Sequence, residues 1–498
     1  MKTHYLPYTL ILFIAFILNT FMCNMSPFGD YLFCSDVNCF YMAGKAWALG
    51  YIPYVDFIDS KGPLLFLIFA IGYLISPENT YGVYILASLS TAITLILIYK
   101  TAYYFTKSTY RAIFVAVCCS AALFFKPYYG YGPRTEQFII PFSTLIMYFL
   151  TTKIEKLNID SKYWIYFGII LGICTAVFLL TKYVYIVYPL SAFICSCIFL
   201  NNHREKGRKF LYISCSYILS FAVFCLPFLC YMLLTESLDA CIWSYFKLSA
   251  QGSTQNTQLT LQATLFSHLT RFIKSTYSEP AFYVVMASIA TFCLPFYRRQ
   301  LSIRNRLVCI LVFSSLVFCC SIGLYRYYLL VYFPLFAFLI ILLTECRFLN
   351  NSNYTVLSLI VIILSISSYL LSIQWKKYKR IPIAPADYSR NYQEVENLIK
   401  AKFRAKIIYM DQLAQGFGIR SGAIPACQAW CRLPNLPVTG RELEEIRKNA
   451  IINKVPDFIF TFTDTHYINF LQNAGYKHTL TILEGSQMRA GIMLWSRE

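Results

Sequence analysis

Long apolar runs recur through the first 375 residues, and they constrain the fold more than any other feature of the sequence. Of the 498 residues, 58% are hydrophobic and only 13% are charged, whereas a soluble globular chain is about one quarter charged. Runs of about 20 apolar residues can cross the hydrocarbon core of a bilayer as helices. The sequence therefore predicts an α-helical membrane protein that crosses the bilayer many times.

The basic residues set the expected orientation, because they gather in short loops between the apolar runs. Loops such as 203–209 and 298–306 are cytoplasmic under the positive-inside rule, which gives about 11 spans, a cytoplasmic amino terminus and an extracytoplasmic carboxy terminus. Only the basic stretch 376–380 falls on the other side. The expected spans are Tyr5–Met25, Tyr81–Phe105, Tyr110–Phe125, Gln137–Thr152, Tyr163–Thr181, Tyr183–Leu200, Phe210–Leu234, Pro280–Phe296, Leu307–Leu324, Tyr328–Thr344 and Tyr354–Ile373.

One apolar segment, Pro63–Ile75, has only 13 residues and is too short to span, so we expect it to lie in the interface or to re-enter the membrane. The net charge of +19 is explained by the cytoplasmic loops and by anionic membrane lipids. No basic stripe is interleaved with polar surface, which excludes a nucleic-acid partner. A further aromatic segment around 242–246 is expected to lie in the interface.

The composition changes near residue 381 to that of a soluble protein. A helical period over Tyr392–Phe403, short apolar strands at Lys406–Met410 and Asp457–Phe462, and a hairpin pattern over Ile482–Trp495 indicate a small α/β domain. Thr439 with Glu442 forms the pattern of a capping box that opens another helix. We therefore expect a transmembrane domain over 1–375, which contains a first outside loop at 26–62, and an extracytoplasmic α/β domain over 381–498.

Charged residues are concentrated in the first outside loop, where they are costly beside a bilayer and hence functional candidates. Asp36, Asp56, Asp59 and Lys61 fall within 26 residues of one another. Asp36 is expected near the amino terminus of a short helix, where it is either a capping residue or a functional carboxylate. Lys61 is either a membrane-anchoring lysine or a cation that meets a lipid phosphate.

These residues carry a resemblance to a known family. Asp36, the Gly50-x-x-Pro-Tyr-x-Asp56 stretch and Lys61-Gly-Pro63 resemble the first extracytoplasmic loop of the membrane-embedded GT-C glycosyltransferases, in the branch of the bacterial protein mannosyltransferases and aminoarabinose transferases. Arg134-Thr-Glu136 is similar to the short motif that follows the third helix of that family, and Arg326-Tyr-Tyr is similar to a weaker late motif. The chain departs from the family at Val37 and Gly62, where Glu and Pro are common, and the first departure puts a metal requirement in doubt.

The resemblance implies an enzyme that takes a monosaccharide from a polyprenyl-phosphate donor and transfers it to a cell-envelope glycan, lipid or protein. It implies that Asp36 is the base, with inversion at the anomeric carbon, and that Lys61, Arg134 and Arg326 hold the phosphate. Asp56, Asp59 and Glu136 would then orient sugar hydroxyls or bind a divalent cation. The implied location is a bacterial inner membrane.

Two other functions and two thiol pairs stay open. The charged loop is also compatible with a transporter or flippase of lipid-linked sugars, although no internal repeat is visible, and with a polysaccharide polymerase or ligase that uses a diphosphate-linked donor. Among the 19 cysteines, Cys34 with Cys39 and Cys427 with Cys431 are candidate disulfides, because they lie in loops on the oxidising side. No cysteine spacing indicates a zinc site.

Overall fold

The computed structural model describes residues 5–28, 35–124, 129, 132–153, 162–200, 206–248, 330–331, 333–345, 353–355, 357–358, 360–361, 386–411, 416–431, 439–482 and 492–497. The chain divides into two compact units. The helical unit comprises Met1–Met22, Ala87–Phe228 and Leu259–Ile366, and the loop unit comprises Cys23–Leu86, Leu229–Gln258 and Ser367–Glu498. The expected spans Pro280–Phe296 and Leu307–Leu324, most of Tyr354–Ile373, Cys34 and Arg326 lie outside the described residues.

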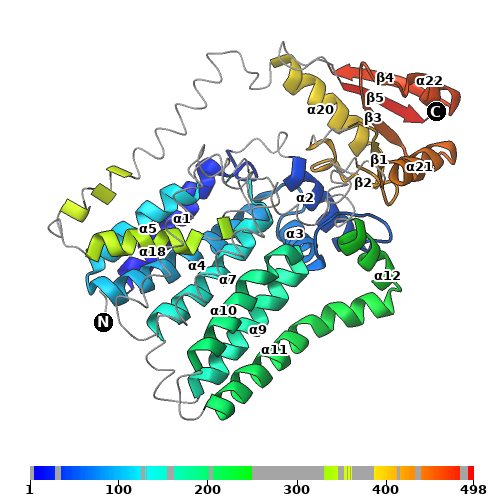
Figure 1. Ribbon diagram of the computed structural model, residues 1–498. Coiled ribbons are helices and arrows are strands. Elements are labelled where there is room, and N and C mark those ends of the chain that lie inside the picture. The colour runs from blue at the N-terminus through cyan, green and yellow to red at the C-terminus, as the bar shows by residue number, and fades with distance from the viewer. Residues whose placement is uncertain are drawn as a thin grey trace, which may run out of the picture. The chain divides into compact units, whose positions relative to one another are not determined.

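The helical unit is built from apolar helices close to the expected spans (Figure 1). Its helices pack through one continuous apolar core, in which α5 contacts α1 and α18, and α7 contacts α9, α10 and α18. The bounds are α1 Leu6–Met22, α4 Tyr81–Thr106, α5 Thr109–Leu123, α7 Thr135–Thr152, α9 Lys162–Lys182, α10 Val187–Leu200, α11 Lys206–Leu234 and α18 Phe333–Glu345, with α4 and α11 each extending into the loop unit.

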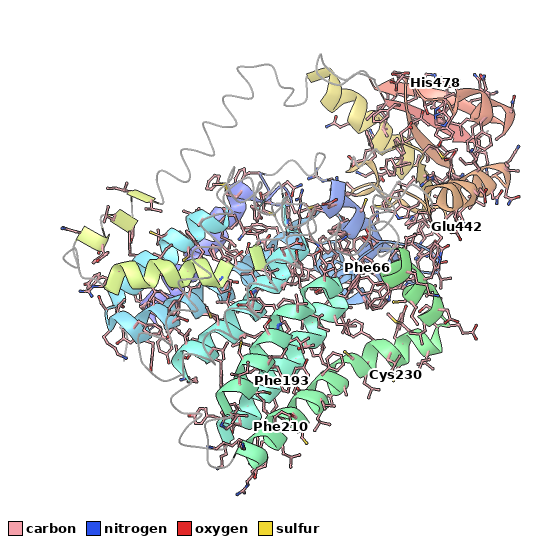
Figure 2. All side chains as sticks on the ribbon, viewed as in Figure 1. Phe66, Phe193, Phe210, Cys230, Glu442 and His478 are labelled. Atoms are coloured by element: carbon pink, nitrogen blue, oxygen red, sulfur yellow. The ribbon has the colours of Figure 1, made fainter. Side chains whose placement is uncertain are left out.

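Three described helical stretches are long and apolar enough to cross a membrane, namely Tyr81–Thr106, Lys162–Ile198 and Lys206–Leu234. The second contains the short helix η2 (Tyr183–Ile186) between α9 and α10, at the place where the sequence predicts a break. Most side chains of α11, including the labelled Phe210 and Cys230, are exposed rather than packed in the core (Figure 2). This exposed apolar surface suits a helix that faces lipid.

A buried polar network ties three helices of this unit together. The Gln137 side-chain amide on α7 donates to Asn19 Oδ1 on α1 at 3.2 Å and to Thr91 Oγ1 on α4 at 3.1 Å. Asn19 in turn donates to Thr91 Oγ1 at 3.1 Å, and Ser90 donates to the carbonyl of Gln137 at 2.6 Å. Such hydrogen bonds fix helix register where no water competes, so α7 and its first residues are held firmly.

The loop unit combines two short helices, a turn and the carboxy-terminal domain. Helices α2 (Ser35–Ala48) and α3 (Pro63–Ile75) pack closely against each other, and α3 has the predicted bounds. A Cβ at Gly44 of α2 would lie 2.6 Å from the backbone of Phe69 and Ala70, so only glycine permits this approach. The predicted aromatic segment forms α12 (Leu238–Cys241) followed by the π-helix η3 (Ile242–Leu248).

The carboxy-terminal domain is an α/β structure with a five-stranded sheet in the order β2-β1-β3-β5-β4 (Figure 1). Strands β1 (Lys406–Tyr409) and β3 (Phe458–Phe462) are parallel and lie where the sequence predicts them. Strands β4 (Tyr476–Ile482) and β5 (Ile492–Arg497) pair antiparallel from Ile482 opposite Ile492, which confirms the predicted hairpin pairing. The remaining elements are β2 Ile424–Pro425, α20 Ala386–Lys400, η5 Gly416–Gly418, α21 Thr439–Ile452 and α22 Ile468–Asn473.

Candidate functional site

The first group of candidate residues lies in the loop unit, at the start of α2 and in the turn that connects α2 to α3. Asp36 is in the first turn of α2, where a negative charge is stabilised by the helix dipole. On the same helix Phe40 and Ala43 are buried, and the Phe40 ring lies 5.8 Å from that of Phe69 on α3. Packing against α3 therefore fixes the position of Asp36.

The connecting turn is folded around the carboxylate of Asp56. The backbone N–H of Ile52 donates to Asp56 Oδ2 at 2.6 Å, and the N–H of Asp56 donates to the carbonyl of Ile52 at 2.9 Å. Between them Tyr54 has a φ of +70°, which is uncommon for a bulky residue. The N–H of Tyr54 donates to the Phe57 carbonyl at 2.8 Å. Asp56 thus stabilises this turn, and its contact with substrate stays a prediction.

The tyrosine also fixes the backbone around Lys61. Its hydroxyl donates to the carbonyl of Lys61 at 2.8 Å. Its ring contacts that of Phe66, labelled in Figure 2, at a centroid distance of 5.6 Å, and Phe57 contacts the same ring at 5.7 Å. The backbone beside Lys61 therefore has little freedom, although the side chain itself is 20% exposed.

Asp59 and Lys61 form an ion pair at the end of this turn. Lys61 Nζ lies 3.8 Å from Asp59 Oδ1 and donates to Ser60 Oγ at 3.0 Å. The ammonium group also lies 5.6 Å from the centre of the Phe40 ring, within the range of a cation–π contact. At 3.8 Å the pair is long, so an incoming anion can compete for the lysine.

Burial raises the pKa of the Asp59 carboxyl above its usual value, and the negative charge of Asp36 raises it further, whereas Lys61 and the contacts with Ser60 lower it. The charge of Asp36 is therefore close enough to influence the ionisation of Asp59. Asp36, Asp59 and Lys61 form one electrostatic group, which we call the loop cluster.

The carboxy-terminal domain contributes to the same unit. The side-chain amide of Gln428 donates to the carbonyl of Tyr54 at 2.7 Å, and the Ile58 N–H donates to the carbonyl of Gln428 at 3.0 Å. Ile58 also packs in an apolar cluster with Leu248 and Leu443. No sequence pattern indicates that Gln428 supports this turn, because the contact joins segments more than 350 residues apart.

The second group of candidate residues lies in the helical unit. Glu136, in the first turn of α7, is only 1% exposed, and its Oε1 accepts from Lys182 Nζ at 2.7 Å and from the Tyr185 hydroxyl at 2.6 Å. Arg134 occupies the N-cap position of the same helix. The salt bridge of Glu136 therefore joins it to Lys182 at the end of α9, a residue that the sequence analysis did not select.

The structure thus brings Asp36, Asp56, Asp59 and Lys61 together in the loop unit, and Arg134 and Glu136 together in the helical unit. A signal for Lys182 was present in the sequence, because a lysine within the apolar stretch 162–198 requires a partner. Among the described residues no group of three His, Cys, Asp or Glu side chains is arranged to hold a metal ion. The divalent cation stays a prediction.

Comparisons with known proteins agree with the resemblance seen in the motifs. Residues 60–231 match the sequence model of the family described as dolichyl-phosphate-mannose-protein mannosyltransferase. Comparison with curated protein sequences gives no significant match.

Among solved structures, ArnT from Cupriavidus metallidurans bound to undecaprenyl phosphate is similar with a TM-score of 0.57 at 12% identity, over 99% of this chain and 98% of that chain. The apo state of the same protein gives a TM-score of 0.56 at 10% identity, over 98% and 97% of the two chains. These matches show a shared fold along almost the whole chain. The resemblance of this membrane protein to the GT-C glycosyltransferases, which the motifs of its first loop indicate, is thereby confirmed.

Proposed function

We propose that this protein is an integral-membrane glycosyltransferase that moves a monosaccharide from a polyprenyl-phosphate donor to a hydroxyl of a cell-envelope glycan, lipid or protein. The observation that carries the proposal is the loop cluster, in which Lys61 is partly exposed and only loosely paired with a buried carboxylate. This cation lies at the start of the region that matches the mannosyltransferase family. The similar ArnT structure, described as bound to undecaprenyl phosphate, supports a donor of this class.

The chemistry assigns different roles to the members of the cluster. A sugar attached to a lipid phosphate already has a good leaving group, so the reaction needs a base for the acceptor hydroxyl and a cation for the departing phosphate. Asp36 would accept the proton of the acceptor hydroxyl while that oxygen attacks the anomeric carbon from the face opposite the phosphate. The bond from carbon to phosphate oxygen then breaks, and Lys61 neutralises the charge left on the phosphate. The product is inverted at the anomeric carbon.

The other predicted residues have less direct roles in this proposal. Asp59 holds the ammonium group of Lys61 until the phosphate replaces it, and Asp56 keeps the turn folded. Arg134 and Arg326 remain candidates for further phosphate contacts. Glu136 already accepts hydrogen bonds from Lys182 and Tyr185, which favours a supporting role over contact with the sugar. The proposed location is a bacterial inner membrane, with the loop cluster and the carboxy-terminal domain outside the cytoplasm.

The test uses the full-length protein in proteoliposomes with radiolabelled undecaprenyl-phosphate mannose or undecaprenyl-phosphate aminoarabinose and an envelope extract as acceptor. We expect label to move from the donor to the acceptor, and Asp36→Asn to abolish transfer while donor binding persists. Lys61→Gln should weaken donor binding, whereas Lys100→Gln, which removes an exposed lysine of α4 that is not a candidate site residue, should leave transfer unchanged. Movement of intact donor across the bilayer without transfer would favour the lipid-linked-sugar transporter instead.

A further inference from the structure

Two cysteines that are 392 residues apart in the sequence meet inside the loop unit. Cys39 Sγ, on α2, lies 3.8 Å from Cys431 Sγ, at the end of the segment that carries Gln428. From the sequence alone, each of them is a candidate to pair with a nearby cysteine, Cys39 with Cys34 and Cys431 with Cys427. We propose that Cys39 and Cys431 form a disulfide that joins the helix bearing Asp36 to the carboxy-terminal domain.

Both sides of the contact are held by hydrogen bonds that do not involve the sulfur atoms. The guanidinium of Arg447 donates to the carbonyl of Cys431 at 3.2 Å, and the N–H of Tyr409 donates to the carbonyl of Trp430 at 2.8 Å. On α2 the ammonium group of Lys45 donates to the carbonyl of Gly418 at 2.8 Å. A covalent bond between sulfur atoms is about 2.05 Å long, so a shift of about 2 Å in two side chains is enough to form it.

The groups around Cys39 affect how readily its thiol reacts. Contact with the Cys431 thiol and, next, burial raise the pKa of the Cys39 thiol, so the reactive thiolate is scarce once the unit is closed. The two thiols lose two protons and two electrons, and an oxidising protein disulfide outside the cytoplasm accepts them and becomes a dithiol.

The consequence for the enzyme is a covalent support for its base. Cys39 is three residues after Asp36, one turn along the same helix. The two cysteines are 392 residues apart in the chain, and the entropic gain from closing a loop grows with its length. This proposal rests on the extracytoplasmic orientation given under the proposed function, but not on sugar transfer itself.

The test is peptide mapping of the full-length protein purified from cells that were lysed in N-ethylmaleimide. We expect a peptide pair that joins residues 39 and 431, that disappears after reduction with dithiothreitol and in Cys39→Ser, and that persists in Cys427→Ser. Reduction should also lower the melting temperature of the wild type by several degrees while leaving the Cys39→Ser/Cys431→Ser double variant unchanged. Recovery of both cysteines as alkylated thiols, or a peptide that joins 427 and 431, would overturn the proposal.

A second measurement separates this proposal from the proposed function. Asn453→Cys adds a thiol at an exposed turn of the carboxy-terminal domain, and labelling of spheroplasts with a membrane-impermeant maleimide shows on which side that domain lies. If the variant is labelled more strongly than the wild type and Cys39 and Cys431 are both recovered as alkylated thiols, the disulfide alone is overturned. If the variant is labelled no more than the wild type, the extracytoplasmic orientation and the disulfide are both overturned. A joined peptide without any sugar transfer overturns the proposed function alone.

Discussion

Two of the lysine–carboxylate pairs among the described residues, Lys182 with Glu136 and Lys61 with Asp59, differ in length and in burial. Lys182 and Glu136 lie 2.7 Å apart and are almost fully buried, and the Tyr185 hydroxyl donates to the same carboxylate oxygen. Lys61 and Asp59 lie 3.8 Å apart, and the lysine side chain is 20% exposed. Removing one partner of a short buried pair is strongly destabilising, because it leaves an uncompensated charge in the interior. A long, partly exposed pair stabilises little, which leaves its lysine available to a ligand.

Breaking the buried pair should give the largest effect. Lys182→Met leaves the Glu136 carboxylate without its cation inside the helical unit, and we expect a loss of about 3–5 kcal/mol in the free energy of unfolding. The double variant Lys182→Met/Glu136→Gln should recover much of that loss, because no buried charge remains. Denaturation of the detergent-solubilised protein, followed by tryptophan fluorescence, measures both. If the single variant is as stable as the wild type, the pair is not a structural element.

A third lysine, Lys45, is buried like Lys182, and its ammonium group donates hydrogen bonds to the carbonyls of Gly418 and Ile419. Burial lowers the pKa of Lys45 from its usual 10.5 to about 7, although Glu396 acts in the opposite direction. At pH values between about 7 and 10.5, Lys45 is protonated in the unfolded chain but has released its proton in the folded chain. The free energy of unfolding therefore rises with pH in this range. From pH 7 to pH 9 the wild type should gain about 2 kcal/mol relative to Lys45→Met. Melting curves of both proteins at the two pH values test this, and a constant difference would contradict it.

Substitution in the Lys61–Asp59 pair should show the opposite balance, with a small effect on folding and a clear effect on binding. For Lys61→Gln we expect a change of about 1 kcal/mol or less in stability. Loss of a charge-assisted contact with phosphate, about 1.5–3 kcal/mol, should weaken binding of undecaprenyl-phosphate mannose roughly 10- to 100-fold. Binding to the purified protein in detergent gives the affinity, and Lys100→Gln is the matched control. Equal affinities in both variants would show that Lys61 is only an anchor.

The sequence predicted the loop cluster better than the buried pair, and the reason is physical. The charges of Asp36, Asp59 and Lys61 stand out because they are near one another in an apolar chain and lie around short elements whose bounds follow from proline, glycine and length. The partner of Glu136 depends on which helix packs beside α7, and periodicity contains no information about that choice. The same limit applies to Gln428 and Cys431, whose contacts with the first loop require the folded domain.

Helix positions were predictable to within a few residues where apolar runs are long, as for α4 and α11. The strands β1 and β3 were also found, because short apolar runs between polar segments favour buried strands. The assignment of Asp56 to ligand binding stays a prediction, beside a role in the turn that only the structure shows. Its carboxylate accepts a hydrogen bond from a backbone N–H only four residues away, and a sequence pattern cannot separate such a turn residue from a ligand.

The smallest expected effect comes from Asp59, the carboxylate that pairs with Lys61. Since burial first, and Asp36 in addition, raise the pKa of Asp59, its proton is bound more tightly in the folded protein than in the unfolded chain. Its contribution to stability is therefore greatest at low pH and is lost as the pH rises through the folded pKa.

Protonation of Asp59 also removes the competitor for Lys61. A phosphodiester donor keeps one fixed charge across this range, so its affinity for the wild type should rise a few-fold as the pH falls. Asp59→Asn should bind the donor at least as tightly as the wild type and lose most of this pH dependence. An affinity that falls in Asp59→Asn would mean that the carboxylate holds Lys61 in its binding position, and the contrast between a structural pair and an exchangeable pair would then fail.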